Sequence, residues 1–550
     1  MTPARRNAIA AVGVVLAALA LHAHALGYGF LNWDDNRFIT ANPLFTAGGW
    51  AYVRAALTRV QVEAYHPLHL LSYLPDQWLW PDRAAGFHAV GLALFGLDAG
   101  LLFRLARRHA GPGAAAAAVL LFVAHPLCVE PVDWISGRKE LLAAAFFVGV
   151  LLVEDARVAT DVRVSPAGLL LIAAAILSKT STLCLPPLVW FWLVWMRPTT
   201  PRIATRRALP YALLGLVPAI AVVTIWRQHQ MLGPRPVAAP IDVLATLATY
   251  ARRTVWPHDL AIIYPAQMPA AVVSAALAGA FLVAGVLLWR RLPPPARFAL
   301  VAFPVALLPV ANIVPVGLRF ADRYAFLALA ILVPPAAAGL DALFGAGKPS
   351  RAVAIGAVTV AVLSLAAVTL AQSATWASSR TLWARAAAAH PEDVRARLRY
   401  GDALFEARDW AGARDEFQAA VRLEPLSSFG YAALFFLYAS RAEDEGRIPP
   451  GTAHAWILAF RDAQTRSATF DAFMAEVPHA VCPQCADTLL LLRLRRWPRP
   501  DGALRQAARG ALNEGAPDAA LIFLDGAVDK GAPEWRALND EAGRALSATR

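Results

Sequence analysis

Residues 8–29 read AIAAVGVVLAALALHAHALGYG, and residues 31–39, close behind this stretch, read LNWDDNRFI. The first stretch holds about 20 mostly apolar residues, the length that an α-helix needs to cross the hydrocarbon core of a membrane. Arg5 and Arg6 precede it as in a signal peptide, but we expect no cleavage before Tyr28. The sequence therefore predicts a retained membrane helix, followed by a loop that carries two adjacent carboxylates.

Similar apolar stretches recur through the first two-thirds of the chain. Hydrophobic residues make up 58% of the 550 residues and charged residues 16%, which is more apolar than soluble domains are. This composition argues against a soluble enzyme, excludes a disordered chain and favours an all-α, polytopic membrane helix bundle. About eleven stretches are candidate spans: 8–29, 86–106, 113–129, 140–153, 166–178, 182–196, 208–226, 270–289, 298–317, 324–343 and 352–371.

The charge distribution divides the chain in two. From Gln372 onward there are 22 Lys and Arg against 23 Asp and Glu, which leaves 29 against 16 for residues 1–371. A basic excess confined to the apolar part is typical of a membrane domain and argues against nucleic acid as a partner. We therefore expect a membrane domain over 1–371 and a soluble domain over 372–550.

The basic residues between the candidate spans predict the orientation. With the N-terminus in the cytoplasm, the arginine-rich turns alternate onto the cytoplasmic side, as the positive-inside rule requires. The larger segments 30–85, 125–139, 227–268 and 312–323 then lie on the other side, and so does everything after residue 371.

The soluble part carries the period of a tetratricopeptide repeat. Pro391 and Pro425 are 34 residues apart, and the small and aromatic positions of the repeat lie between them at Gly401, Ala413, Phe417 and Ala420. A degenerate match follows at Ala520, Leu524 and Ala527. The pattern predicts an α-solenoid that binds an acceptor protein or peptide, the alternative being a rigid stalk or dimerisation element.

The outer segments are rich in ionisable residues, which near a bilayer usually line a cavity or binding site. The adjacent pair Asp34 and Asp35 could act as a general base, bind a divalent cation, or cap a helix. Two His-Pro pairs, at His66 and His125, suggest zinc, but only His69 lies at a ligand spacing from either, so no zinc site is predicted. The other residues expected in the pocket are Glu130, Glu140, Asp322 and Tyr324.

Three separate basic motifs fall on the same outer side. Arg presents a planar fork to phosphate oxygens and Lys a compact charge, so the motifs together predict a phosphate pocket. Anchoring of lipid head groups is the alternative. The five basic residues are Arg138, Lys139, Lys179, Arg319 and Arg323.

The order of these motifs resembles a known family. W-D-D, H-P-L, V-E-P-V-D-W-I-S-G-R-K-E, S-K-T, Y-A-R-R-T-V-W-P and R-F-A-D-R-Y, followed by a tetratricopeptide repeat, is similar to the transmembrane and tetratricopeptide-repeat protein O-mannosyltransferases and their bacterial relatives. The resemblance covers the chain to about residue 425. It implies the type C glycosyltransferase architecture, a polyprenyl-phosphate-linked sugar as donor, and an active site on the non-cytoplasmic face.

The resemblance also implies roles for single residues. The acidic pair of the family's first outer loop corresponds to Asp34 and Asp35, its Arg-Lys-Glu motif to 138–140 and its Asp-Arg-Tyr motif to 322–324. We therefore expect an inverting membrane glycosyltransferase of the bacterial inner membrane, with Asp34 as base, Asp35 as its support and no certain cofactor. The sugar, possibly mannose, would pass to Ser or Thr of an exported protein. The alternatives are a glycolipid or envelope polysaccharide as acceptor, and a non-catalytic scaffold.

Overall fold

The computed structural model describes residues 2–59, 65–197, 199–228, 240–264, 287–313, 320–345, 347–424 and 533–549, with isolated residues between these ranges. Within them all regular structure is helical and no strand occurs, so the predicted all-α class is confirmed for the described residues. The chain divides into two compact units, Met1–Arg385 and Ala386–Arg550.

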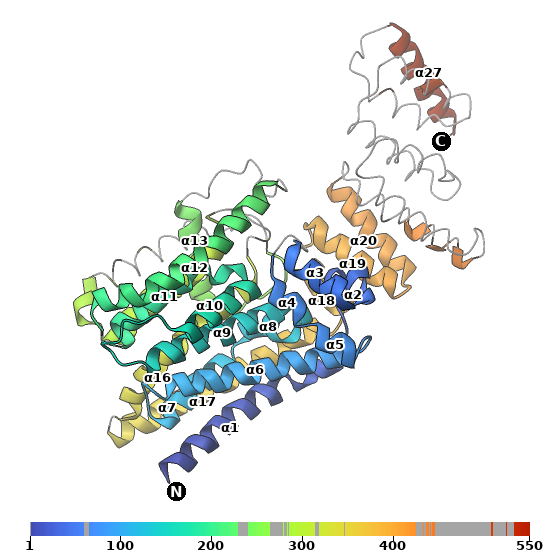
Figure 1. Cartoon of the computed structure of the whole chain (residues 1–550). Helices are drawn as coiled ribbons and strands as arrows, with labels where there is room; N and C mark the ends of the chain where they lie inside the picture. The colour runs from blue at the N-terminus through green and yellow to red at the C-terminus, as the bar shows by residue number, and fades with distance from the viewer. Residues whose placement is uncertain are drawn as a thin grey trace. The chain divides into compact units, whose positions relative to one another are not determined.

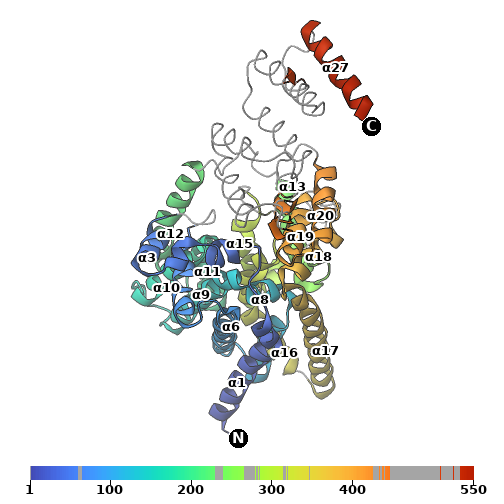
Figure 2. The ribbon, with the colours of Figure 1, turned by 90° about the vertical axis from the view of Figure 1, so that its right-hand side faces the viewer.

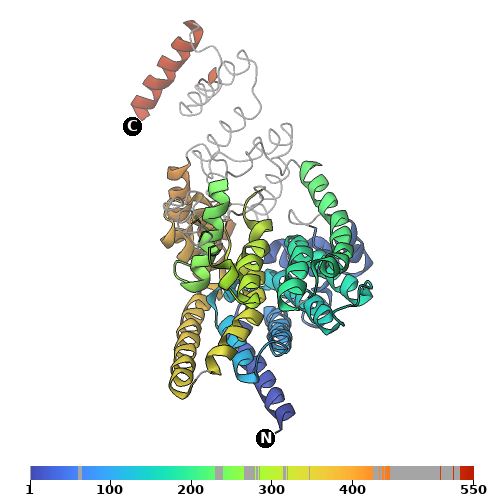
Figure 3. The ribbon, with the colours of Figure 1, turned by 90° about the vertical axis from the view of Figure 1, so that its left-hand side faces the viewer.

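Five helices of the first unit pack side by side. They are α1 (Pro3–His22), α6 (Ala84–Ala106), α7 (Pro112–Val123), α16 (Phe326–Phe344) and α17 (Lys348–Ser373). In Figure 1, α1 and α6 run along each other. Figures 2 and 3, turned in opposite directions, show α1 in blue and α17 in gold reaching the same end of the unit. Apolar side chains such as Val353, Val360 and Leu363 of α17 are exposed, as expected of a helix that faces lipid.

Four helices are long and apolar enough to cross a membrane: Pro3–Gly27, Ala84–Ala106, Asp322–Phe344 and Ser350–Trp376. A fifth results if Pro112–Val123 and Pro126–Asp133, which meet at 61°, form one broken span. Pro166–Ser178, Thr180–Met196 and Pro294–Val310 are apolar but shorter. The described residues thus contain four or five helices that could cross a membrane. The count of eleven stays a prediction, and most of the candidate span 270–289 lies outside the described residues.

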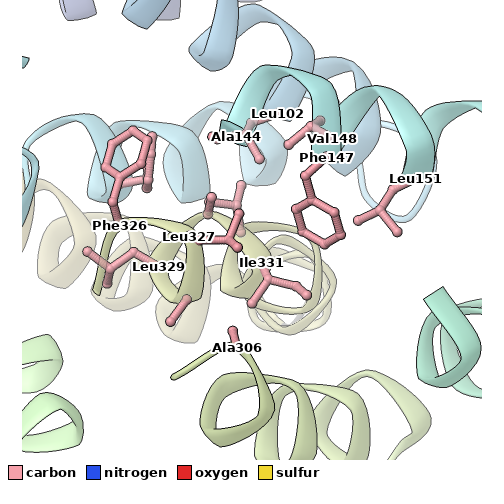
Figure 4. Packing of buried hydrophobic residues seen from close by; sticks show 14 of the residues in the cluster. Leu102, Ala144, Phe147, Val148, Leu151, Ala306, Phe326, Leu327, Leu329 and Ile331 are labelled. Carbon is pink, nitrogen blue, oxygen red and sulfur yellow. The ribbon is translucent and has the colours of Figure 1, made fainter. Parts of the chain in front are cut away.

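The core of the first unit lies where α6, α9 (Arg138–Ala156), α15 (Pro294–Leu307) and α16 meet. Figure 4 shows Leu102, Phe147, Leu151 and Ile331 gathered in this core, with Ala306 of α15 at its edge. All five side chains are buried. Because these helices are apolar on several faces, each can pack on more than one neighbour.

The helices that follow α9 form a further group within the first unit. α10 (Pro166–Ser178) packs on α9, and α11 (Leu185–Phe191), continued by the π-helix η6 (Trp192–Met196), packs on α12 (Pro201–Gln228) and α15. A short 3-10 helix, η5 (Thr180–Cys184), connects α10 to α11, and α13 (Pro240–Val255) follows α12.

The C-terminal end of α9 carries buried ion pairs, here called the Glu154 cluster. Glu154 accepts hydrogen bonds from Arg207 Nε at 2.7 Å and from Arg157 Nη1 at 2.8 Å. The next residue, Asp155, accepts from Arg108 Nη1 at 2.9 Å. The cluster therefore joins the ends of α6, α9 and α12. These arginines were expected in cytoplasmic turns, and here they also pair with acids inside the protein.

Between α1 and α6 the chain forms short helices rather than an irregular loop. They are η2 (Asn36–Thr40), α2 (Pro43–Ala47), α3 (Gly49–Thr58), α4 (Pro67–Leu71) and α5 (Leu74–Leu79). Proline stands in the first turn of α2, α4 and α5, where the helix leaves the N–H without an internal partner anyway. Gly48 and Gly49 have φ of 63° and 66°, a left-handed conformation that glycine adopts without strain, and they turn the chain from α2 into α3.

The second unit contains the predicted helical hairpin. Its helices are α19 (Val394–Glu406) and α20 (Trp410–Leu423). A side chain at Gly401 would overlap the ring of Phe417, so the small residue lets the two helices approach. α18 (Ser379–Ala389) crosses the division between the units, and α27 (Pro533–Thr549) is the last helix. A solenoid of such repeats stays a prediction, because residues 451–500 and most of the degenerate match at 520–527 lie outside the described residues.

Candidate functional site

Residues 129–140, VEPVDWISGRKE, connect distant parts of the first unit. They follow the bend after α7 and form α8 (Val129–Asp133), the 3-10 turn η4 (Ile135–Gly137) and the first turn of α9. All of them are buried except Lys139, which is half-buried. A Cβ atom on Gly137 would lie 2.7 Å from the carbonyl oxygen atoms of Glu130 and Pro131, so only glycine fits this tight turn. We call these residues the 129–140 segment.

The 129–140 segment holds Asp35 in a fixed position. Asp35 Oδ1 accepts hydrogen bonds from the backbone N of Ser136 at 3.1 Å and from its hydroxyl at 2.5 Å, while Oδ2 accepts from Leu31 N at 2.9 Å. The Asp35 side chain is fully buried. Burial raises the pKa of this carboxyl to about 6, against the opposing effect of the bonds from Ser136 and Leu31. Asp35 therefore anchors the loop and is closed to a substrate.

Asp34 is the accessible member of the acidic pair. Its side chain is 20% exposed, and Arg37 Nη1 lies 3.8 Å from Oδ1. The carboxylate is also within electrostatic reach of Lys139. The structure thus separates two neighbours that the sequence alone could not distinguish, because only Asp34 presents a carboxylate from which a proton can be exchanged.

Charged residues gather around Lys139 and are here called the Lys139 cluster. Lys139 Nζ lies 5.3 Å from the centre of the Trp134 ring and 5.7 Å from that of Phe38. It has no hydrogen bond or ion pair with any residue that the structure describes. An unpaired, half-buried ammonium group is costly, so a further anion would stabilise it. The members of the cluster are Asp34, Glu130, Lys139, Glu140, Lys179 and Arg323.

Two further cations of the Lys139 cluster are paired. Lys179 Nζ forms an ion pair with Glu140 Oε2 and lies 5.5 Å from the centre of the Tyr324 ring. The other oxygen atom of Glu140 is buried without a hydrogen-bond partner in the described part of the chain. Lys179 directly follows α10, so this ion pair ties the end of α10 to the start of α9.

Arg323 stands in the short 3-10 helix η9 (Asp322–Ala325) that leads into α16. Glu130 binds it twice: Oε1 pairs with the Arg323 guanidinium, and Oε2 accepts from the Arg323 backbone N at 2.8 Å. The guanidinium carbon lies 5.2 Å from the Trp134 ring centre and 5.1 Å from that of Tyr324. Arg323 is therefore held rigidly beside Lys139, with its charge balanced by Glu130.

Asp322, the neighbour of Arg323, contacts Tyr264 and Arg253, which are not members of the Lys139 cluster. Its Oδ1 accepts a 2.6 Å hydrogen bond from the Tyr264 hydroxyl, and Arg253 Nη1 lies 3.9 Å away. The Arg253 guanidinium stacks on the Tyr264 ring at 3.9 Å. Asp322 thus joins α13 and the Tyr264 turn to the start of α16.

Arg138 faces the protein interior. One of its terminal nitrogen atoms, Nη1, donates to Ser72 O at 2.8 Å and to the Asp76 carboxylate, and the other, Nη2, donates to Phe87 O at 2.9 Å. Its side chain is 1% exposed. Both terminal nitrogen atoms of the guanidinium therefore have partners inside the protein, an arrangement that favours a structural role over the predicted contact with a phosphate.

The three predicted histidines lie in different surroundings. Thr180 N donates to His66 Nε2 at 3.3 Å, and burial together with Lys139 lowers the pKa of His66 to about 3. His69 is fully buried and contacts the Tyr73 hydroxyl at 2.8 Å. His125 accepts from Leu127 N and caps the short helix that follows the bend after α7. Of the three, His66 is the one that interacts electrostatically with both Lys139 and Lys179, and it does so as a neutral imidazole.

The donor set does not fit the divalent cation that the sequence allowed at Asp34 and Asp35. Both oxygen atoms of Asp35 already accept hydrogen bonds, so Asp34 alone has a carboxylate to offer. Within the described ranges no group of three His, Cys, Asp or Glu residues could hold a metal ion. The reaction below is therefore derived without a metal.

Sequence reasoning missed several residues that shape the cluster. Ser136 and Trp134 stand within a motif quoted above but have no role there, and Asp76 lies in none of the motifs. Arg253 belongs to a motif that carries only the family resemblance, and Tyr264 lies in none of the quoted motifs. An acid or a hydroxyl within an apolar stretch is a usable signal, since a buried polar group needs a partner. Arg319, the remaining predicted cation, lies outside the described residues.

The Lys139 cluster is thus assembled from the loop after α1, the 129–140 segment, the end of α10 and the start of α16. No protein-family model matches the chain, and neither a curated protein nor a solved structure matches it. The resemblance to the O-mannosyltransferase family therefore stays a prediction that rests on the motifs themselves.

Proposed function

We propose that the protein is an integral membrane glycosyltransferase that moves a sugar from a polyprenyl-phosphate carrier to a hydroxyl group of an extracytoplasmic acceptor. One observation carries the proposal: the partly exposed carboxylate of Asp34 and the unpaired ammonium of Lys139 lie in one charged cluster, beside helices that could cross a membrane. Transfer of a sugar from a phosphate-linked donor needs two groups. A base takes the proton of the acceptor, and a cation without a partner stabilises the phosphate that leaves.

The charges within the cluster support a donor with an anionic leaving group. Glu140 balances Lys179, and Glu130 balances Arg323, whereas Asp34 and Lys139 have no such tight partner. A phosphodiester placed against Lys139 would supply the missing anion. The neighbouring cations would add to the positive potential there, and Arg323 would be aligned by Glu130 rather than by the substrate.

The proposed reaction is a displacement at the anomeric carbon. Asp34 takes the proton of the acceptor hydroxyl as its oxygen forms the new bond to this carbon. The bond between the anomeric carbon and the phosphate oxygen breaks, and the electron pair leaves with the polyprenyl phosphate. Lys139, with Lys179 and Arg323 beside it, stabilises this leaving group, so no covalent intermediate on the protein is needed.

The direct test is transfer by the purified, lipid-reconstituted protein. Polyprenyl-phosphate donors carrying radiolabelled mannose or glucose are offered together with peptides that contain Ser and Thr, or Ala in their place. We expect label in the Ser and Thr peptides only, and at least about 100-fold slower labelling with Asp34→Asn protein. Donor consumption without labelled peptide would redirect the proposal to a glycolipid or polysaccharide acceptor. No consumption of any donor would contradict it.

The proposal includes an orientation, with the N-terminus in the cytoplasm and the second unit outside, where its helical hairpins would bind acceptors. Alkaline phosphatase, which is active only outside the cytoplasm, is fused after Arg550 for this test. We expect an active fusion in bacterial cells. An inactive fusion, together with a fluorescent cytoplasmic reporter at the same point, would place the second unit inside and contradict the orientation.

A further inference from the structure

The short helix α5 has its polar and apolar sides reversed relative to a helix that faces water. Its acidic residue, Asp76, is fully buried and paired with Arg138. Pro75, Trp78 and Leu79, at spacings of three and four residues, form its exposed side. Trp78 is 87% exposed and Leu79 57% exposed. Large apolar groups so far out of the protein are expected where a membrane or another protein covers them.

The neighbouring helix α3 shows a related pattern. Tyr52, Ala55 and Ala56 face the protein, as their burial shows. The opposite side consists of Trp50, Arg54 and Leu57, which follow one another at spacings of four and three residues and are all exposed. Tryptophan beside a cationic and an aliphatic residue is the composition of helices that lie at a membrane surface.

The two helices are connected to each other. The Gln77 side chain of α5 donates to Phe45 O in α2, and Gly48, at the turn from α2 to α3, lies against the same side chain. Trp50 stands two residues after Gly48 and Trp78 one residue after Gln77, so both tryptophans lie close in sequence to residues that are in contact. We define the α3–α5 face by its six exposed residues: Trp50, Arg54, Leu57, Pro75, Trp78 and Leu79.

The position of α5 along the chain identifies what covers this face. Leu79 is five residues from Ala84, where the candidate span α6 begins, so the two are at most about 18 Å apart. Trp80, between them, packs against Gly86 in the first turn of α6. The polar head-group layer of a bilayer extends about 5–8 Å beyond each side of its hydrocarbon core. Because Trp80 contacts the first turn of α6, the residues directly before it lie within or beside this layer.

We propose that the α3–α5 face lies in the head-group layer of the bilayer, on the same side as the Lys139 cluster. Trp50 and Trp78 insert their rings between glycerophospholipid head groups, and Arg54 contacts phosphate oxygens. The opposite side of α5 is bonded through Asp76 to Arg138, the residue next to Lys139. The cluster is thereby held at a fixed depth, at the level of lipid head groups. This inference depends on membrane insertion and not on the proposed reaction.

The test measures the depth of single labelled positions in liposomes of phosphatidylcholine with phosphatidylglycerol. An environment-sensitive fluorophore is attached to Trp78→Cys in the full chain with Cys482→Ser and Cys485→Ser; the other two cysteines, Cys128 and Cys184, are buried. Val360→Cys, on the exposed side of the candidate span α17, is the deep control. Leu423→Cys, an exposed apolar position in the second unit, is the aqueous control.

We expect the label at 78 to show blue-shifted emission and to be quenched most by lipids with a nitroxide near the head group. The label at 360 should be quenched most by a nitroxide deep in the acyl chain, and the label at 423 only by iodide in the buffer. Iodide quenching at 78 equal to that at 423 would overturn the proposal. So would a label at 78 that both quenchers fail to reach, because protein would then cover the face. A Trp50→Cys label must agree with position 78.

Discussion

The two ends of α9 are both charged and both buried, yet they differ in how their charges are paired. At the C-terminal end, Glu154 binds two arginines at 2.7–2.8 Å and Asp155 binds a third at 2.9 Å. At the N-terminal end, about 22 Å away at 1.5 Å per helical residue, Lys139 has no charged partner within bonding distance in the described part of the chain. One helix thus connects a charge cluster that is complete with one that is not.

The difference indicates which cluster serves the fold and which can receive a ligand. A buried charge whose partner is removed destabilises the protein strongly, so acids like Glu154 are retained for structure. A cluster that leaves an ammonium group without a bonded anion gives up stability unless another molecule supplies that anion. The Lys139 cluster has this property, and the Glu154 cluster does not.

The largest expected effect distinguishes Asp34, a member of the Lys139 cluster, from its neighbour Asp35. Asp34→Asn keeps the size of the side chain but cannot take a proton, so transfer should slow by about 10²–10⁴-fold with donor binding unchanged. Asp35→Asn should slow transfer less, since Asp35 acts through the loop. The measurement is single-turnover transfer at saturating donor. Equal loss in the two variants would show that the acidic pair acts as one unit.

Glu154→Gln should disrupt the Glu154 cluster without changing the residues proposed for sugar transfer. Removing one partner of a buried ion pair typically destabilises a protein by about 3–5 kcal/mol, and here two arginines would lose their carboxylate. We expect a lower Tm and an unchanged donor affinity in the folded protein. Arg138→Met should likewise lower Tm and leave donor affinity unchanged, because this substitution leaves Asp76 unpaired. Loss of donor affinity in Arg138→Met at full stability would return Arg138 to the phosphate site.

Lys139→Met and Arg138→Met form a matched pair of variants for comparison. The two residues are adjacent in sequence, but only Lys139 lacks a bonded carboxylate, so its removal should leave Tm nearly unchanged. Donor affinity should fall by about 1.5–3 kcal/mol, or about 10–150-fold in Kd, as for a hydrogen bond to a charged group. Titration with a labelled polyprenyl phosphate measures the affinity. A lower Tm with unaltered affinity would make Lys139 structural and the comparison between the two ends of α9 wrong.

The smallest effect concerns pH. The pKa of Asp35, at about 6, lies above its ordinary value of 3.8, so between these values the folded state holds more protons than the unfolded state. The contribution of this carboxyl to stability is therefore fully present below pH 3.8 and decreases as pH rises toward 6. Thermal unfolding of wild type and Asp35→Asn across pH 4–7 should show the variant gaining relative to wild type as pH rises. A constant difference in Tm would contradict the raised pKa.

Four of the predicted spans coincide with helices long enough to cross a membrane. Residues 86–106, 324–343 and 352–371 fall within such helices, and residues 8–29 overlap one that ends at Gly27. Shorter stretches were ambiguous because an apolar run does not reveal whether lipid or protein surrounds it. The stretch 140–153 belongs to α9, whose core-facing side chains include Phe147 and Leu151, and charged residues stand at both of its ends.

The candidate site was predictable in its members but not in their partners. Composition and order along the chain indicated Asp34, Lys139 and Arg323, since each follows or precedes an apolar stretch on the same side. That Arg138 turns inward while Lys139 does not depends on Asp76, which lies 62 residues earlier and reaches Arg138 only in the folded protein. Such pairings depend on how the helices pack against one another. The hydrophobic periodicity of a sequence does not predict this packing.

The many connections of the 129–140 segment impose an order on assembly during synthesis. Chains emerge from the ribosome N-terminus first, so Ser136 and Arg138 find Asp35 and Asp76 already made. Glu140 must wait for Lys179, and Glu130 for Arg323, which is made nearly 200 residues after it. Until then two buried acids lack their cations, a state that the bilayer disfavours. The nascent chain therefore completes its charged centre only when η9 and the start of α16 dock, and a ribosome stalled before residue 323 would hold an unfinished site.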